Sequence, residues 1–260
     1  MGQQHYRLIV VGGGITGLST ALAWTKIYPD RPVLVLERHT IVGGCVSTFA
    51  RQGYKFDTVQ IIPDIADLLD FFGIEMTLKK FEGYYARLFL ADPVTVTAKL
   101  FPIPSTLPDF EGLLRDRFPE EGSAIQRFFS YCSAMHDELQ HLKTEPKSWQ
   151  IPAILWHCPK IIANSGKTYA QFLRHFQFRD PELLEVLDIF SSFSGLSGVR
   201  CAALLTAAAM VTTLKGSFRP AGGFIQFPQQ LRRQLEVRGG EVRTGVTVQK
   251  ILIENGRAYG

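Results

Sequence analysis

Three glycines near the N-terminus have the spacing of a dinucleotide-binding turn. Gly12, Gly14 and Gly17 follow a short apolar strand and lead into an apolar helix. In this pattern the first glycine permits a tight turn, the second admits a pyrophosphate to the backbone, and the third lets helix and strand pack closely. The N-terminus of the helix adds free N–H groups and a positive dipole end. These residues predict a site for the phosphates of a dinucleotide.

An acidic residue and a second glycine turn narrow the choice of dinucleotide. Glu37 closes the second apolar strand, and its carboxylate can accept hydrogen bonds from both hydroxyls of a ribose. Gly43 and Gly44 then offer a second close approach to the backbone. An extended flavin dinucleotide needs such an approach and a nicotinamide dinucleotide does not, although a plain turn is the alternative interpretation. The segment therefore favours FAD.

Composition and charge restrict the partners. The chain has 260 residues, of which 46% are hydrophobic and 20% charged, enough for two domains or one domain with an insertion. Its net charge of +4 is not gathered into a basic run, so no nucleic-acid partner is expected. Binding to an anionic membrane surface is an alternative that the charge leaves open. The four cysteines lack a C-x-x-C pair, which indicates free thiols in a reducing compartment. We expect a cytoplasmic protein, either soluble or peripheral on a membrane.

Hydrophobic periodicity predicts α/β segments at both ends of the chain and a helical block between them. Helices are expected at about 15–27, 63–72, 110–118, 125–142, 168–176, 180–190, 199–214 and 228–238. Strands are expected at 7–11, 32–37, 241–244, 246–254 and 257–260, with a turn and a short strand within 51–57 and a hairpin of 84–90 and 94–97. The segment 144–163, rich in proline and tryptophan, is interpreted either as a buried connection or as an apolar loop that contacts a membrane or lipid.

At this point the sequence resembles the phytoene desaturase, carotenoid isomerase and retinol saturase group of the amine-oxidase-like flavoproteins. Three segments carry the resemblance, 11–18 with the residues around Glu37 and Gly44, Gly53 to Asp57 with the helix that follows, and 219–223 with 239–251. The resemblance implies an α/β fold in which a Rossmann-like FAD-binding domain of the GR2 type carries an inserted mixed α+β substrate domain. The expected bounds are 1–75 and 216–260 for the FAD-binding domain and 76–215 for the substrate or cap domain.

The same resemblance implies an FAD-dependent oxidoreductase of carotenoid biosynthesis or related chemistry. Its substrate would be a carotenoid or another long apolar isoprenoid, which is desaturated, saturated or isomerised. The implied cofactor contacts are Gly12, Gly14, Ile15, Thr16 and Gly17 at the pyrophosphate, Glu37 at the ribose, Arg38 and Gly44 at the neighbouring turn, and Val248 at the adenine. No motif marks a catalytic residue or a metal ligand. The alternative is a non-catalytic or truncated relative that binds a lipid or a partner chain.

Three departures from the group bear on the flavin site. Cys45 stands where the group often has arginine after the glycine pair, and Asp57 is followed by Thr58 and Val59 rather than by a residue and glycine. The group also has a C-terminal Gly-Asp segment that contacts the flavin, and this chain ends at Gly260 before it. We therefore expect the fold to be incomplete at the C-terminus, with a further C-terminal half or a partner chain completing the site.

Overall fold

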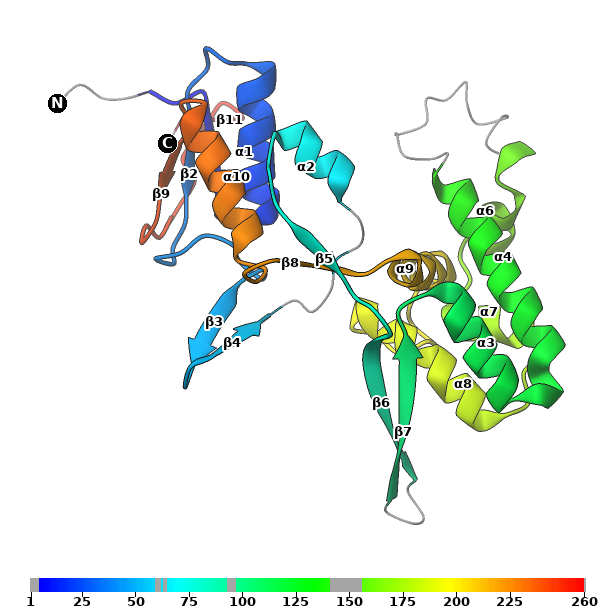
Figure 1. Cartoon of the computed structure of the whole chain (residues 1–260). Coiled ribbons are helices and arrows are strands. Elements are labelled where there is room, and N and C mark those ends of the chain that lie inside the picture. The colour runs from blue at the N-terminus through cyan, green and yellow to red at the C-terminus, as the bar shows by residue number, and fades with distance from the viewer. Residues whose placement is uncertain (1–4, 59–61, 63–64, 93–96, 141–155, 260) are drawn as a thin grey trace. The chain divides into compact units, whose positions relative to one another are not determined.

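A computed structural model of the chain describes residues 5–58, 62, 65–92, 97–140 and 156–259 (Figure 1). The chain divides into two compact units. The terminal unit comprises Met1–Lys80 and Phe218–Gly260, and the central unit comprises Phe81–Ser217. The two ends of the chain thus fold together, and the middle folds separately.

A parallel sheet forms the centre of the terminal unit. Its strands are β1 (Leu8–Val11), β2 (Val33–Leu36) and β9 (Glu241–Arg243), in the order β1-β2-β9. Leu34 of β2 pairs with Ile9 on one side and with Glu241 on the other. As the middle strand, β2 buries Val33, Leu34 and Val35 in succession, because a strand flanked on both sides and covered on its faces has no need of polar alternation.

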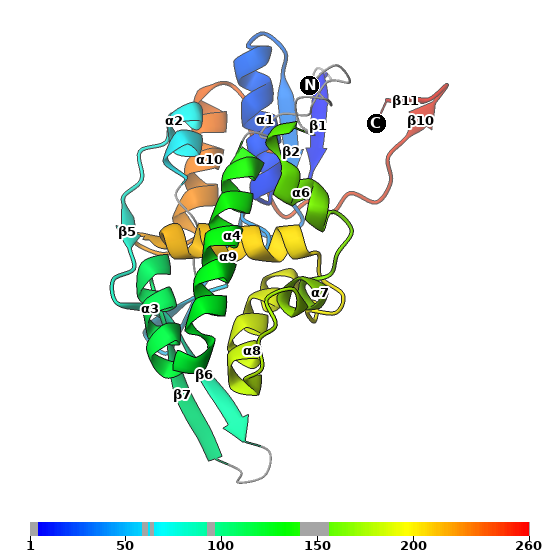
Figure 2. The same ribbon diagram turned by 90° about the vertical axis from the view of Figure 1, so that its right-hand side faces the viewer.

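Two helices cover this sheet. In the terminal unit, α1 (Ile15–Ile27) and α10 (Gln226–Val237) lie side by side, as both views show (Figure 1 and Figure 2). The helix α1 begins and ends where the sequence predicts. One apolar cluster unites the sheet with both helices, and its fully buried members include Leu18, Leu22, Val33, Val35, Leu231 and Leu235. Packing of α10 on α1 therefore joins the C-terminal segment to the glycine turn.

The remaining elements of the terminal unit are short. They are the hairpin β3 (Thr48–Arg51) and β4 (Tyr54–Asp57), the antiparallel pair β5 (Leu78–Lys80) and β8 (Phe218–Pro220), the hairpin β10 (Ile253–Glu254) and β11 (Arg257–Ala258), and helix α2 (Ala66–Phe72). Gly73 ends α2 in the left-handed conformation, and its N–H donates to the carbonyl of Asp70 at 3.1 Å. The expected end of this helix at residue 72 is therefore confirmed.

The central unit is a helical block with one hairpin. Its elements are β6 (Tyr84–Asp92), β7 (Thr97–Pro104), α3 (Leu107–Arg117), η1 (Pro119–Glu121), α4 (Gly122–Gln140), α6 (Pro159–Asn164), α7 (Tyr169–Arg174), α8 (Pro181–Asp188), η3 (Ile189–Ser194) and α9 (Ala203–Lys215). Aromatic rings fill its core. The ring centroid of Phe128 on α4 lies 5.1 Å from that of Phe176 and 5.2 Å from that of Phe129. Phe128, Cys132 and Met135 are fully buried and form the core-facing stripe of α4.

Of two predicted strands, one lies largely outside the described residues and the other is mostly absent. The second hairpin strand was expected at 94–97, of which 94–96 are not described, and β7 runs from Thr97 to Pro104, with Phe101 and Ile103 facing the core and Leu100 facing outward. The strand expected at 246–254 exists only as β10, at Ile253–Glu254. Alternating apolar residues form a strand only beside a partner, and within the described part of the chain the stretch before β10 pairs with none.

The segment 144–163, for which contact with a membrane or lipid is one interpretation, lies largely outside the described residues. Residues 141–155 hold most of the proline-rich segment and are not described. Its described end forms α6, which begins at Pro159. Among the helices that the structure describes, none has the length and apolar character needed to cross a bilayer.

Candidate dinucleotide site

The first glycine turn is tied to the sheet by its backbone. Gly12 follows β1 with a φ of 105°, a conformation that favours glycine, and its N–H donates to the carbonyl of Leu36 at 2.8 Å. A Cβ added to Gly17 would lie 2.1 Å from the carbonyl oxygen of Gly12. The turn therefore needs glycine at position 12 for its conformation and at position 17 for the close approach of α1.

The N-terminus of α1 is left without a side-chain cap. Gly14 is the N-cap residue, no side chain accepts a hydrogen bond there, and the first turn holds no acidic residue. Ile15, Thr16 and Gly17 form that first turn, whose N–H groups have no acceptor within the helix. An exposed helix start of this kind can bind an anionic group through its amides and its dipole.

Glu37 lies directly beside the glycine turn. The residue is 6% exposed, and its carboxylate accepts the N–H of Gly13 at 2.6 Å and the N–H of His39 at 2.8 Å. Burial raises the pKa of Glu37, but the N–H donors of His39 and Gly13 outweigh it, so the pKa lies below its ordinary value. The carboxylate is ionised at neutral pH and keeps lone pairs that can accept hydroxyl donors.

Sequence reasoning missed Gly13. A Cβ at this position would lie 3.0 Å from the Cβ of Glu37, so the residue must be small for the carboxylate to reach its N–H. The signal was present in the run of three consecutive glycines, of which the spacing pattern uses only two.

The second glycine turn meets the first, backbone against backbone. The N–H of Gly43 donates to the carbonyl of Gly13 at 2.8 Å, and Gly43 forms a parallel bridge with Gly14. A Cβ at Gly44 would lie 3.2 Å from the Cα of Gly14. Cys45, the departure from the resembled group, is exposed and carries a free thiol, as do the three buried cysteines. The cradle, defined here as residues 12–17, Glu37, Gly43 and Gly44, is thus one continuous backbone surface.

A second polar network lies in the terminal unit around Asp57. Its carboxylate accepts two hydrogen bonds from Arg219, at 3.0 Å from Nε and 2.7 Å from Nη2, and also accepts the Thr48 hydroxyl and the Phe224 N–H. The hydroxyl of Thr48 in turn accepts the N–H of Ile225 at 3.1 Å. We call this network the Asp57 clasp. It joins the β3–β4 hairpin to the start of α10, which the sequence pattern did not predict.

Burial and hydrogen bonding act in opposite directions on Asp57. Burial raises the pKa of this carboxyl, while the donors Thr48, Phe224 and Arg219 together lower it below its ordinary value. The ionised form is therefore the one that the clasp stabilises.

Two predicted contact residues lie at the margin of the cradle. Arg38 is exposed, and its Nε lies 3.3 Å from Nε2 of His39. Val248 lies in an irregular stretch, and among the described residues no hydrogen bond joins it to the cradle. The chain reaches Glu37 two residues earlier, where the N–H of Val246 donates to the Glu37 carbonyl at 2.9 Å.

Several known proteins are similar to the chain in sequence. Residues 10–62 match the model of the NAD(P)-binding Rossmann-like domain. The chain is 26% identical to all-trans-retinol 13,14-reductase of Rattus norvegicus over 97% of its own length, and 25% identical to the chloroplastic prolycopene isomerase of Daucus carota over 99% of it. It spans 43% of the length of each relative.

Solved structures share the fold. An oxidoreductase from Methanosarcina mazei aligns with a TM-score of 0.67 at 21% identity, covering 97% of this chain and 54% of that one. Cyclohexylamine oxidase from Brevibacterium oxydans aligns with a TM-score of 0.56 at 17% identity, covering 92% and 51%. The resemblance found in the sequence is confirmed, because the chain is similar over most of its length to a retinol reductase and a prolycopene isomerase and shares the fold of a solved oxidoreductase and a solved amine oxidase.

Proposed function

We propose that this chain is part of an FAD-dependent oxidoreductase that acts on a carotenoid or a related long apolar isoprenoid. The observation that carries the proposal is the glycine-built cradle around Glu37, in a chain that is similar to a retinol reductase over 97% of its length. The relatives' names concern isoprenoid alcohols and carotenes, which are long and apolar. The reaction would change the reduction state or the geometry of the substrate's double bonds.

The residues of the cradle fit FAD. The uncapped amides of Ile15, Thr16 and Gly17 would hold the pyrophosphate, and Glu37 would accept the hydroxyls of the adenosine ribose. The missing side chains at Gly14 and Gly44 allow the two glycine turns to lie against each other. When bound, the flavin supplies hydride or electron transfer, while this chain binds and orients it.

The division of the chain into two units suggests that cofactor binding and substrate binding are separated. The terminal unit would bind FAD, and the central unit would contribute the contacts with the apolar substrate. The FAD-binding part is proposed to comprise residues 1–75 and 216–260, and the substrate part residues 76–215. Contact of the segment 144–163 with a membrane or lipid stays part of this proposal.

Titration with FAD tests the proposal directly. We expect the purified chain to bind FAD in about a one-to-one ratio, with a flavin absorption band near ~450 nm. Glu37→Gln should weaken binding about tenfold or more, because a charged acceptor of ribose hydroxyls is lost. Glu75→Gln changes an exposed carboxylate of the same unit and should leave the affinity unchanged.

A chain that stays colourless after FAD is added would overturn the proposal for this polypeptide. If that colourless chain still bound a carotenoid, measured by the carotenoid's absorption shift, a non-catalytic lipid-binding relative would be supported instead.

A further inference from the structure

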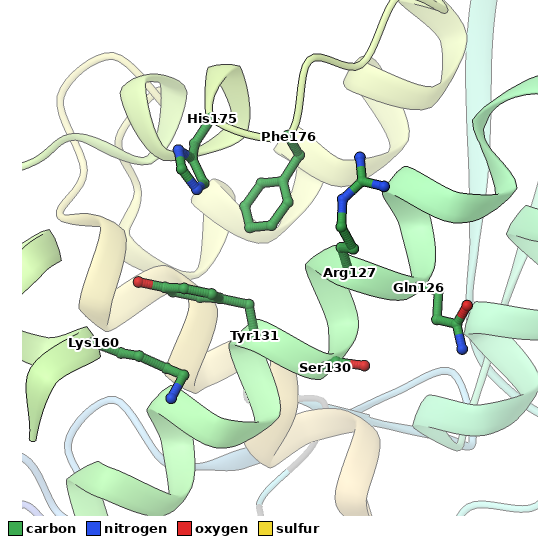
Figure 3. A pocket seen from close by; sticks show the side chains of 7 residues that line it. All are labelled: Gln126, Arg127, Ser130, Tyr131, Lys160, His175 and Phe176. Carbon is green, nitrogen blue, oxygen red and sulfur yellow. The ribbon is translucent and has the colours of Figure 1, made fainter. Parts of the chain in front are cut away.

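The central unit carries a pocket that the proposed function does not use. It measures about 520 Å³ and is lined by Gln126, Arg127, Ser130, Tyr131, Lys160, His175 and Phe176 (Figure 3). Most of these residues come from one face of α4, and the others come from α6 and the end of α7. We call it the α4 pocket. The pocket is largely open to solvent and is large enough to hold a small organic ligand.

Two aromatic rings in the pocket are held in place. Phe176 is 5% exposed, and its ring centroid lies 5.9 Å from that of Tyr131 in an edge-to-face arrangement. The Tyr131 hydroxyl accepts a hydrogen bond from Nδ2 of Asn164 at 2.9 Å, and Asn164 is itself 3% exposed. Phe176 therefore supports the partly exposed ring of Tyr131, which is a preorganised surface on which another planar ring can stack at little entropic cost.

The charged residues that line the pocket, Arg127 and Lys160, are both basic. Lys160 is partly neutralised by Glu138, with Nζ 3.3 Å from Oε1. Arg127 has no ion-pair or hydrogen-bond partner among the residues that the structure describes. None of the seven lining residues is acidic. In Figure 3 the rings of Tyr131 and Phe176 are seen between Arg127 and Lys160.

We propose that the α4 pocket binds a small molecule that joins an aromatic ring to a phosphate group. The guanidinium of Arg127 offers the planar donor pair that suits phosphate oxygens. The ring of the ligand would lie against Tyr131. A phosphate monoester fits better than a carboxylate, since the pocket is lined by Arg127 and Lys160 and by no acidic residue, which favours the larger negative charge. The pocket lies wholly in the central unit and shares no residue with the cradle.

Phenyl phosphate is the simplest probe of this site. We expect calorimetric titration or saturation-transfer NMR of the whole chain to show phenyl phosphate binding about tenfold or more tightly than inorganic phosphate or phenol alone. Saturation of the chain with FAD should leave this affinity unchanged, because the two sites lie in different units. Arg127→Gln should weaken binding about tenfold, and Tyr131→Leu should remove the preference over inorganic phosphate.

Arg200→Gln is the matched control, since Arg200 is exposed in the same unit and does not line the pocket. Thermal unfolding of Arg127→Gln should match that of the wild type, because its side chain has no partner to lose. Equal affinities for phenyl phosphate and inorganic phosphate would overturn the proposal. So would unchanged binding in Arg127→Gln, or displacement of the probe by FAD, which would place the binding in the cradle.

Discussion

The terminal unit and the central unit depend on opposite kinds of residue. In the terminal unit the cradle exists because Gly17 and Gly43 have no side chains, so backbone segments meet at distances that a Cβ would prevent. In the central unit the core exists because phenylalanine rings such as Phe128 and Phe172 fill the space between the helices. A site built on missing side chains is sensitive to additions, whereas a core built on rings is sensitive to deletions.

Buried carboxylates show that burial alone does not mark a site. Glu121 and Glu138 in the central unit are 9% and 8% exposed, close to the 6% of Glu37. Glu138 accepts the N–H groups of Lys160 and Ile161 and thereby caps α6, and Glu121 accepts those of Arg179 and Asp180. Glu37 differs in its neighbours, because it stands beside glycine turns whose backbone is accessible to a ligand.

The largest effect is expected from a deletion in the central unit. Phe128→Ala removes a fully buried ring in contact with other rings and should lower the free energy of unfolding by about 3–5 kcal/mol. Phe89→Ala, at a residue 74% exposed, should cost less than about 0.5 kcal/mol. Denaturant titration measures both. Hydrogen exchange should show the loss of protection concentrated in α4 and α7. Equal loss in β1 and β2 would contradict the contrast between the units.

In the terminal unit the corresponding test adds a methyl group instead of removing a ring. Gly17→Ala places a methyl group against the carbonyl of Gly12 and should cost about 2–3 kcal/mol, with FAD binding lost. Gly112→Ala makes the same change within α3, where a Cβ meets nothing within 4 Å, and should stabilise the chain by about 0.5–1 kcal/mol. Thermal unfolding and FAD titration of the two variants test the pair. Equal behaviour would show that close approach does not distinguish the cradle.

Local signals in the sequence account for what could be predicted. The helix expected at 15–27 is α1, and the helix expected from 180 is α8, which has Asp180 as its N-cap and Pro181 as its first residue. The structure also brings Glu37 beside the glycine turn, as its place at the end of β2 indicates. The role of these residues at a dinucleotide stays a prediction.

Pairings between distant segments could not be predicted, because no local pattern encodes them. Arg219 meets Asp57 across 162 residues of sequence, and β5 pairs with β8 across the whole central unit. The strand expected at 246–254 shows the opposite case. Its apolar residues alternate as in a strand, but they have no partner strand in the described chain. Local periodicity identifies segments that are able to form strands, and tertiary contacts decide which of them do.

A smaller loss is expected at the Asp57 clasp. Asp57→Asn replaces a carboxylate that faces Arg219, Thr48 and the Phe224 N–H, and should cost about 2 kcal/mol at neutral pH. Asp30→Asn, an exposed residue of the same unit, is the control. Denaturant titration at pH 7 gives the two values. A cost at Asp57 no larger than that at Asp30 would mean that the clasp contributes nothing to stability.

The clasp also predicts a pH dependence. The pKa of Asp57 is lower in the folded chain than its ordinary value, which the unfolded chain has, near ~3.9. Its contribution is therefore complete above the unfolded value and is lost as the pH falls through the folded value. The stability difference between the wild type and Asp57→Asn should be constant from about pH 5 upward and should shrink below about pH 4. A difference that stayed constant down to pH 3 would contradict ionic stabilisation.

The smallest effects compare two helix starts. The helix α7 has a full capping box, in which Thr168 and Gln171 exchange hydrogen bonds at 3.3 Å and 2.9 Å, whereas α1 starts at Gly14 with no cap. Thr168→Ala should cost about 1 kcal/mol and leave FAD binding intact.

Gly14→Ser should have the opposite result. A Cβ at Gly14 has room, its nearest neighbour being 3.9 Å away, and the backbone is already extended with φ of −71° and ψ of 174°. The serine hydroxyl can therefore cap α1 and add a few tenths of a kcal/mol, about 0.3, to stability. It then competes with the pyrophosphate for the same amides, so FAD should bind about tenfold more weakly. Unfolding temperature and FAD affinity should thus change in opposite directions in this variant. If both rose together, the open start of α1 would not be the phosphate site.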